Sequence, residues 1–310
     1  MTSQNQQRKM KRLILVCAFA CANIDIGLTA LDTAKVDQLI GIKGKLSEKE
    51  NVYKVTWPRG DVKVSVDGWM MPPFMGLGTW AAFTETKDGA MVMGDTVLFE
   101  DEVNVAMTAA LDNGLSVTAL HNHFFFDKPK VYFMHIEGEG SVEQVAGAVR
   151  KIYDAVKQVR AANPQPKESF SANPLPDKNS VSAEPLNKVF GVSGEANNGM
   201  VKFTFGRPAT MHGVKIDNTM GVNTWAAFAG SDENALVDGD FVVTEDELQA
   251  VLKSLLKQKI YIVAVHQHMT HEQPRMMFFH YWGRGRAKEL AENIKSAFFI
   301  AGLQEVSAPK

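Results

Sequence analysis

The chain carries the same segment twice, at a constant offset of 145 residues. Residues 76–140 align with residues 221–285 without a gap, and about a third of the aligned positions are identical, as expected for a duplicated unit. The period is far longer than that of a solenoid repeat. The sequence therefore predicts two tandem units of one fold, so that each element of the first unit has a counterpart in the second.

Each unit is expected to be α+β, with a mixed or antiparallel sheet and helices packed on it. Apolar residues at helical spacing predict helices at 33–41, 101–113, 141–159 and 287–301. Alternating and β-branched stretches predict strands at 52–57, 62–66, 79–84, 91–99, 115–123 and 131–137. The repeated segments Trp80-Ala81-Ala82-Phe83 and Trp225-Ala226-Ala227-Phe228 are expected to bring the two units face to face.

The chain is predicted to divide into four parts. Residues 1–30 form a signal peptide, 31–160 the first repeat, 161–185 a linker, and 186–310 the second repeat. The linker is expected from its five prolines among Ser, Asn and Lys. A hydrophobic content of 45% in 310 residues is sufficient for two globular domains.

The N-terminal region has the pattern of a secretory signal. Lys11 and Arg12 precede the apolar run 13–22, which is too short to span a membrane. Ala22 or Ala30 is suitable for cleavage, and Cys21 lies in a loose lipoprotein box. We expect an exported protein of the periplasm or cell envelope, which contacts a membrane only if a lipid anchor is attached.

Charge and cysteine content exclude several functions. The net charge is −2 although four basic residues precede the apolar run, so the mature chain is acidic and nucleic acid is not an expected partner. The two cysteines, Cys17 and Cys21, both lie in the predicted signal region. Disulfides, Cys-ligated zinc and thiol catalysis are therefore not expected in a chain cut after this region.

Six of the eight histidines occupy matched positions in the two copies. Each copy has a His-x-His pair followed twelve residues later by a third histidine, which gives His121, His123 and His135, and His266, His268 and His280. On a strand, His-x-His directs both imidazoles to one face, and imidazole is the commonest metal ligand. These six residues are the predicted metal ligands.

The expected strand register brings the three histidines of a copy close together. A hairpin between 115–123 and 131–137 places His135 opposite Ala119 and diagonal to His121. Period-two alternation also predicts that His121 and His123 extend the core-facing row that contains Val117. Three imidazoles with one open position are typical of a catalytic zinc site. The expected cofactor is a divalent transition metal, with zinc as first choice and copper as the alternative suggested by Met269 and Met276.

The second copy is richer in ligands than the first. It has His271 and Glu272 where the first copy has Phe126 and Asp127, and it adds His212. We therefore expect the chemistry in the second copy, with Glu272 as general acid or base and His271 as proton shuttle or extra ligand.

Each of these residues also has a structural interpretation. The histidines can be satisfied core residues. Trp80 and Trp225 can be buried packing residues instead of stacking platforms for a ring-shaped ligand. Arg59 and Arg207 can form exposed ion pairs instead of an anion clamp, and Glu100-Asp101-Glu102 is explained by a helix start.

Several motifs resemble those of the bacterial LppY/LpqO family. These are the His-Asn-His and His-Gln-His-Met-x-His-Glu-x-Pro-Arg segments, the Trp-Ala-Ala-Phe blocks and the Gly-Asp/Glu-Asp-Glu run, and the resemblance covers both repeats. It implies an envelope protein with a signal peptide or lipid anchor and no established activity. The first copy departs from the motif in the loop 124–129, where phenylalanines replace the His and Glu of the second copy.

Two functions follow as hypotheses. The first is an exported metal-binding protein, acting as a metal-dependent hydrolase on a small or envelope-derived substrate. The second is a non-catalytic envelope module that binds a small ligand in a cleft lined by Trp80 and Trp225, with structural histidines. A third hypothesis, copper handling, requires that Met269 or Met276 contribute to Cu(I) affinity.

Overall fold

The computed structural model describes residues 30–303 except residue 171, so the predicted signal peptide lies outside the described residues. Twelve strands form one antiparallel sheet in the order β1-β2-β5-β6-β9-β7-β16-β18-β15-β14-β11-β10. Six α-helices belong to the described residues, and the α+β prediction is confirmed.

The first unit contains α1 to α3. Its elements are α1 (Thr33–Ile40), β1 (Lys45–Ser47), β2 (Val52–Pro58), β3 (Val64–Val66), β4 (Trp69–Met71), the 3₁₀ turn η1 (Pro73–Met75), β5 (Gly78–Thr86), β6 (Gly89–Phe99), α2 (Glu100–Asp112), β7 (Ser116–His121), β8 (Asp127–Lys128), β9 (Val131–Gly140) and α3 (Val142–Ala162).

The second unit repeats this order from α4 to α6, except for the extra length of the first unit's last helix. Its elements are α4 (Ala183–Phe190), β10 (Glu195–Asn197), β11 (Met200–Gly206), β12 (Ala209–Met211), β13 (Val214–Ile216), η2 (Asn218–Met220), β14 (Asn223–Gly230), β15 (Ala235–Thr244), α5 (Glu245–Lys257), β16 (Tyr261–His266), β17 (Glu272–Gln273), β18 (Met276–Gly285) and α6 (Ala287–Ile300).

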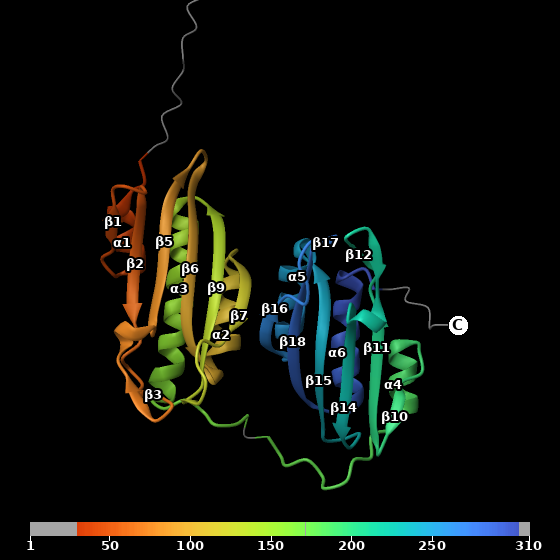
Figure 1. Ribbon diagram of the computed structural model, residues 1–310. Helices are drawn as coiled ribbons and strands as arrows, with labels where there is room; N and C mark the ends of the chain where they lie inside the picture. Colours follow the sequence, from red (N-terminus) through yellow and green to blue (C-terminus); the bar gives the residue numbers. More distant parts are fainter. Residues whose placement is uncertain (1–29, 171, 304–310) are drawn as a thin grey trace, which may run out of the picture.

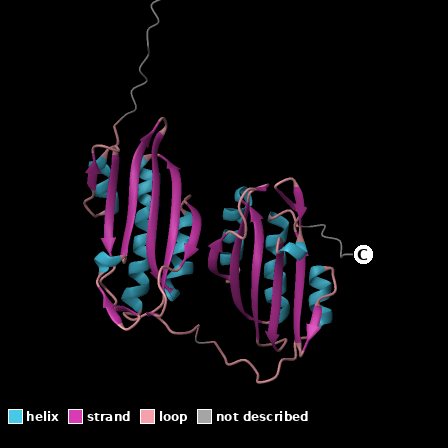
Figure 2. Ribbon diagram, viewed as in Figure 1, coloured by secondary structure: helices cyan, strands magenta, loops and turns pink. Residues whose placement is uncertain are grey.

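The helices cover one face of the sheet in both units and leave the other face open (Figure 2). The buried cluster beneath them runs through both halves and includes Leu120 and Met134 of the first unit and Val265 and Phe279 of the second. Burial of this apolar face against the helices is the main stabilising interaction of the fold. Polar strand residues can therefore occupy the open face without entering the core.

The two units join edge to edge through β7 and β16. Leu120 pairs with Val265, its own counterpart in the second copy, so an approximate two-fold axis passes between these strands. Side chains add equivalent bonds across the junction: the Gln249 amide oxygen accepts the Val117 N–H at 2.8 Å, and the Asn104 amide oxygen accepts the Ile262 N–H at 2.7 Å. The junction is thus an internal pseudo-symmetric interface.

The duplicated Trp segments do not bring the units face to face, and this expectation was wrong. Trp80 lies on β5 and Trp225 on β14, and six strands separate β5 from β14 in the sheet. The unpaired edges of β7 and β16 supply the junction instead, because an open strand edge presents unpaired N–H and C=O groups. A single cleft lined by both tryptophans is therefore excluded.

A β-bulge corrects the expected face of the histidines. The register of β7 against β9 shifts between Val117 and Ala119, and the same shift occurs between Ile262 and Ala264 in the second copy. Val117 and Leu120 both enter the core beneath the helices. The bulge breaks the alternation, so Leu120 points into the core, and the next residue, His121, lies on the open face and does not extend the core-facing row.

Two small three-stranded sheets, unexpected in this form, cover part of the open face. One consists of β3, β4 and β8, and the other of β12, β13 and β17. Each closes a minor apolar cluster, around Phe133 in the first unit and Phe278 in the second. In Figure 1 the first small sheet lies at the lower end of its unit and the second at the upper end of the other, as the pseudo-two-fold relation requires.

The later half of the connection between the units is hydrogen-bonded to the second unit. The Asn179 side chain accepts the Gly230 N–H at 2.8 Å, and Asp232 accepts both the N–H and the hydroxyl of Ser182. The proline-rich connection thus follows a defined path along the surface of the second unit. Among the helices of residues 30–303, none has both the length and the apolar character needed to cross a bilayer.

A buried ion pair joins the first small sheet region to α2. Arg59 is almost fully buried and donates to Glu102 at 2.9 and 3.0 Å, to Asp61 and to the Val97 carbonyl. Glu102 also accepts the Phe99 N–H at 2.9 Å, which completes the start of α2. The expectation of an exposed ion pair was therefore wrong for Arg59, whereas the helix-start interpretation of Glu102 is confirmed.

We predict that Glu102→Ala lowers the free energy of unfolding by about 3–5 kcal/mol, because it removes the buried carboxylate that pairs with both Arg59 and Arg160 and leaves Arg59 only its exposed partner Asp61. The matched variant is Glu247→Ala, which removes the equivalent but half-exposed pair with Arg207. It is expected to cost about 1–2 kcal/mol. Urea denaturation of both variants measures the difference, and equal losses would contradict the assignment.

Candidate metal centre

The second-copy site is built by three neighbouring strands of the open face. Asp240 lies on β15 directly opposite His280 on β18, and His280 lies opposite Ala264 on β16. His266 ends β16, and His268 follows in the loop. The predicted hairpin register is therefore present, with the small Ala264 leaving room beside the imidazole of His280.

Three ligand atoms converge in this site. The His268 Nε2 atom lies 3.2 Å from Asp240 Oδ2 and 3.1 Å from His266 Nε2. The ligand atoms of Asp240, His266 and His268 all lie within 4.8 Å of one another. One carboxylate and two imidazoles at these separations can surround a single metal ion.

In two of the imidazoles, Nδ1 makes a hydrogen bond to a backbone carbonyl, and this bond decides which ring nitrogen carries a proton. The His268 Nδ1 atom lies 3.2 Å from the Gly221 carbonyl oxygen, and His280 Nδ1 lies 3.3 Å from the Gly239 carbonyl oxygen. A carbonyl only accepts, so each Nδ1 carries a proton, and Nε2 is the ring nitrogen left to bind a metal. This arrangement, with the outer N–H donated to a carbonyl, is the usual second contact of a metal-bound histidine.

The resulting lone pairs are poorly satisfied by the protein alone. In the form that binds metal, the Nε2 atom of His268 is an acceptor, and it faces the carboxylate of Asp240, which is also an acceptor. Within the described residues, Asp240 Oδ1 and His266 Nδ1 are buried and have no hydrogen-bond partner. A buried acceptor without a donor is costly, so the donor set is one that a cation would stabilise.

The electrostatics keep the His266 imidazole neutral. Burial, with the nearby His280 and His268, lowers the pKa of His266 to about 4. Burial also raises the pKa of Asp240, while His280 and His268 oppose that shift. At neutral pH His266 therefore offers an unprotonated nitrogen, which is the form that binds metal.

His280 lies beside this group and is not one of its three mutually close members. Its ring stacks on that of His266 with centroids 4.9 Å apart. It also faces Asp238, which shares the open face with Asp240 on β15. His280 is therefore placed to act as a fourth ligand or as a neighbour of one.

The first copy repeats the same arrangement. The His121 ring lies 5.1 Å from both His123 and His135, and Asp95 lies opposite His135. Burial raises the pKa of Asp95 and lowers that of His123. The positions thus match, although in the described residues only the second copy brings three ligand atoms within 4.8 Å.

The first site also opens into a hollow of about 500 Å³. Asp95 and His123 line it together with Trp80, Pro73 and Phe74. Lys54 lies over the Trp80 ring, with its nitrogen 4.1 Å from the centroid. Trp80 is therefore half-buried at the edge of the site.

Glu272 does not join the histidines. Its Oε1 atom accepts the Met276 N–H at 2.9 Å, and its side chain is fully buried beside Arg275. Asp127 accepts the Val131 N–H in the same way in the first copy. Both carboxylates hold the backbone that leads into β18 or β9, so a structural role explains the position without acid-base catalysis.

His271 is exposed in the loop, and its ring centroid lies 6.0 Å from that of His212 on the turn between β12 and β13. Neither belongs to the three-ligand group. The two methionines suggested for copper lie in apolar surroundings: Met276 is buried in the cluster around Phe278, and Met269 packs against it. Core packing accounts for both thioethers.

Asp95 and Asp240 are the site residues that sequence reasoning missed. The signal was the repeated Gly-Asp pair, 94–95 and 239–240, at the same distance from the histidines in both copies. The glycine has a separate reason, because a Cβ on Gly239 would collide with the Tyr281 hydroxyl and the Trp225 carbonyl. The aspartate has no such packing reason and lies among the histidines.

A family model described as Domain of Unknown Function (DUF1259) matches residues 34–155 and 184–299. The chain belongs to this family. The two matched segments correspond to the two units, and they support an uncharacterised tandem-domain family. The LppY/LpqO resemblance stays a prediction.

The other comparisons add little. No curated protein matches the chain. Among solved structures, the crystal structure of a trimeric bacterial microcompartment shell protein PduB is similar at 9% identity, covering 83% of this chain and 89% of that one. Its TM-score is 0.23, so the likeness carries no argument about fold or function.

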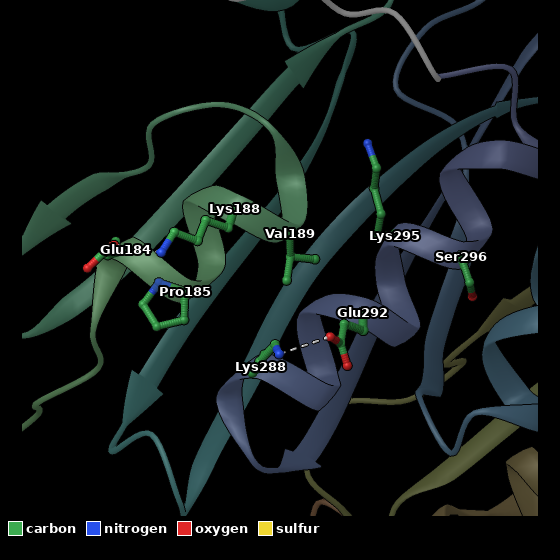
Figure 3. Close-up of a pocket in the computed structure, with 8 residues that line it drawn as sticks. All are labelled: Glu184, Pro185, Lys188, Val189, Lys288, Glu292, Lys295 and Ser296. Atoms are coloured by element: carbon green, nitrogen blue, oxygen red, sulfur yellow. Dashed lines mark ion pairs between the residues drawn. The ribbon is translucent and has the colours of Figure 1, made fainter.

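A larger hollow of about 850 Å³ lies on the helical side, between α4 and α6 (Figure 3). Its charges are paired along the helices, Lys188 with Glu184 at 2.7 Å and Lys288 with Glu292 at 3.6 Å. It contains no histidine, and its exposed pairs are those of a solvated helix surface. The chemistry-bearing side chains lie on the opposite face of the sheet.

We predict that Asp240→Asn weakens zinc binding by at least about tenfold, because a carboxylate ligand is replaced by a neutral amide of the same shape. Competition with a chromophoric chelator measures the affinity. Glu272→Gln is the matched carboxylate control, and it should leave the affinity within about twofold while lowering thermal stability. A larger effect of Glu272→Gln than of Asp240→Asn would overturn this assignment.

Proposed function

We propose that this protein binds a divalent transition metal through Asp240, His266 and His268, with His280 beside them. The observation that carries the proposal is the convergence of three ligand atoms within 4.8 Å, two of them imidazole nitrogens and one on a buried carboxylate whose Oδ1 has no hydrogen-bond partner among the described residues. A structural carboxylate is held by donors, as Glu102 is by Arg59, whereas Asp240 faces imidazoles of the same converging group.

The ligand types favour zinc. Two imidazoles and a carboxylate suit zinc and other borderline metals, whereas copper(I) selects thiolates and thioethers. Three protein ligands with a further position open to solvent are typical of catalytic zinc sites. Since His268 is partly exposed, a small ligand or water can reach this position.

The more specific proposal is that the bound metal catalyses hydrolysis. Zinc lowers the pKa of a bound water to about 7 and polarises a carbonyl or phosphoryl group, which the open face leaves accessible to a small polar substrate. Asp238 is half-buried, interacts electrostatically with His280 and lies on the same strand face as Asp240, and it replaces Glu272 as the candidate base. Export to the periplasm or envelope is proposed from Lys11-Arg12 and the apolar run that follows them. An envelope-derived substrate is compatible with that location.

The alternative is a non-catalytic ligand-binding module. The hollow beside Trp80 and Asp95 in the first unit favours it, because an aromatic wall with a few polar groups is typical of a small-molecule site. Under this alternative each unit binds by itself, since Trp80 and Trp225 lie far apart in the sheet.

Metal analysis of untagged protein tests the proposal directly. We expect close to one equivalent of zinc to remain after dialysis, and the double variant His266→Ala and His268→Ala to lose it while its circular dichroism stays unchanged. The matched double variant His121→Ala and His123→Ala shows whether the first copy holds a second ion. Wild-type protein that takes up no transition metal after reconstitution would end the metal proposal.

Hydrolysis has its own test. Apo and zinc-loaded protein are assayed on activated ester, amide and phosphodiester substrates. The expected result is turnover that requires zinc, is lost in Asp240→Asn, and falls by about 10²–10⁴-fold in Asp238→Asn if that carboxylate acts as base. Zinc-loaded protein without turnover on any class would leave metal binding standing and favour the non-catalytic module.

A further inference from the structure

The first small sheet and its loops expose an unusual group of large apolar side chains. Phe74 is 97% exposed, Phe125 85% and Phe126 78%. Three more exposed residues complete the group, which we name the aromatic rim: Trp69, Met70 and Met75. Soluble surfaces normally scatter such residues singly, so a group of six around one small sheet indicates a binding surface.

The register places these residues together. Val66 on β3 pairs with Trp69 on β4 and with Asp127 on β8, and the Asp67 N–H donates to the Phe126 carbonyl. Phe124 packs towards Gly76, directly after η1, so the phenylalanine loop and the η1 turn are neighbours. In Figure 1 the region around β3 lies at the free lower end of the first unit.

The second unit serves as an internal control. Its elements match one for one, yet Thr219, Thr270 and His271 stand where the first unit has Phe74, Phe125 and Phe126. Phe126 and His271 share a left-handed backbone, with φ 58° and 68°. The fold therefore does not require phenylalanine at these positions, and packing does not explain them.

Exposed lysines border the aromatic rim. Lys63, Lys128 and Lys130 are all exposed, and the described residues show no ion pair for any of them. In the second unit Lys63 and Lys128 are replaced by Pro208 and Gln273.

Few acidic side chains lie near the aromatic rim, and two of them already have a partner. Asp61 is paired with Arg59, and Asp127 accepts the Val131 N–H at 2.6 Å. Asp67 remains on the exposed turn between β3 and β4. The surface therefore combines aromatic side chains with a small excess of positive charge.

We propose that the aromatic rim docks the protein onto an anionic lipid surface. Phenylalanine, tryptophan and methionine side chains enter the boundary between headgroups and acyl chains, and lysines at the border contact lipid phosphates. Charge complementarity favours an anionic lipid surface, whereas two copies docked rim to rim would bring the exposed Lys63, Lys128 and Lys130 of one copy near those of the other. Because Phe74 also lines the hollow that contains Asp95 and His123, docking places the mouth of the first site at the lipid surface.

Vesicle binding of the full chain tests the proposal, with Cys17→Ser and Cys21→Ser in every variant to prevent lipidation. The triple variant Phe74→Thr, Phe125→Thr and Phe126→His carries the second unit's own residues. It should reduce partition into phosphatidylglycerol-containing vesicles by at least about tenfold. Lys63→Gln and Lys128→Gln should each reduce it by about fivefold at low salt. Phe299→Thr removes an exposed phenylalanine elsewhere and should have no effect.

A local probe separates the aromatic rim from the N-terminal apolar run. A fluorophore attached at Phe125→Cys should be quenched by bromolipids, whereas the same fluorophore at Thr270→Cys, the matched position of the second unit, should not. Equal quenching at both positions, no vesicle binding, or unchanged binding of the triple variant would overturn the proposal. So would self-association that the triple variant abolishes without lipid, since the rim would then bind a second copy. Asp240→Asn should bind vesicles normally, because docking does not depend on the metal site.

Discussion

One-sided burial of the sheet is the constraint on which the rest of the structure depends. Helices cover a single face, so each strand residue lies either in the apolar core or on the open face. The bulge after Val117, repeated after Ile262, decides this choice for the histidines. Without the shift, alternation would direct His121 and His266 into the helical core, where two neutral imidazoles would need partners that an apolar cluster does not supply.

Duplication gives the molecule its symmetry, and divergence gives the two halves different surfaces. The junction keeps the symmetry, because Leu120 pairs with its own counterpart Val265, and the side chains of Asn104 and Gln249 each accept a backbone N–H from the other unit. The loops beside the two sites are free of this restraint, since they pack mainly within their own unit. Phenylalanines could therefore accumulate around one site while polar residues stayed around the other.

The candidate site combines stabilising and destabilising features. Burial of Asp240 and His266 beside one another costs desolvation energy, as the raised pKa of the aspartate and the lowered pKa of the histidine both indicate. A fold selected for stability alone would place donors opposite these acceptors, as it does for Glu102 and Arg59. Glu102 is paired with a guanidinium, whereas Asp240 lies in a converging group with two imidazoles, and this difference in partners separates a structural ion pair from a ligand site.

The sequence by itself determined the duplication, the α+β class and the hairpin register, because periodicity and constant spacing are local properties that survive in one dimension. It also indicated the histidine sets, but not the aspartate, which comes from a third strand that only the sheet order brings alongside. Tertiary structure alone decided that Glu272 supports a loop, that Arg59 is buried, and that the units join by β7 and β16. Each of these depends on which neighbour a side chain meets across the sheet, and a pattern along one strand does not contain that information.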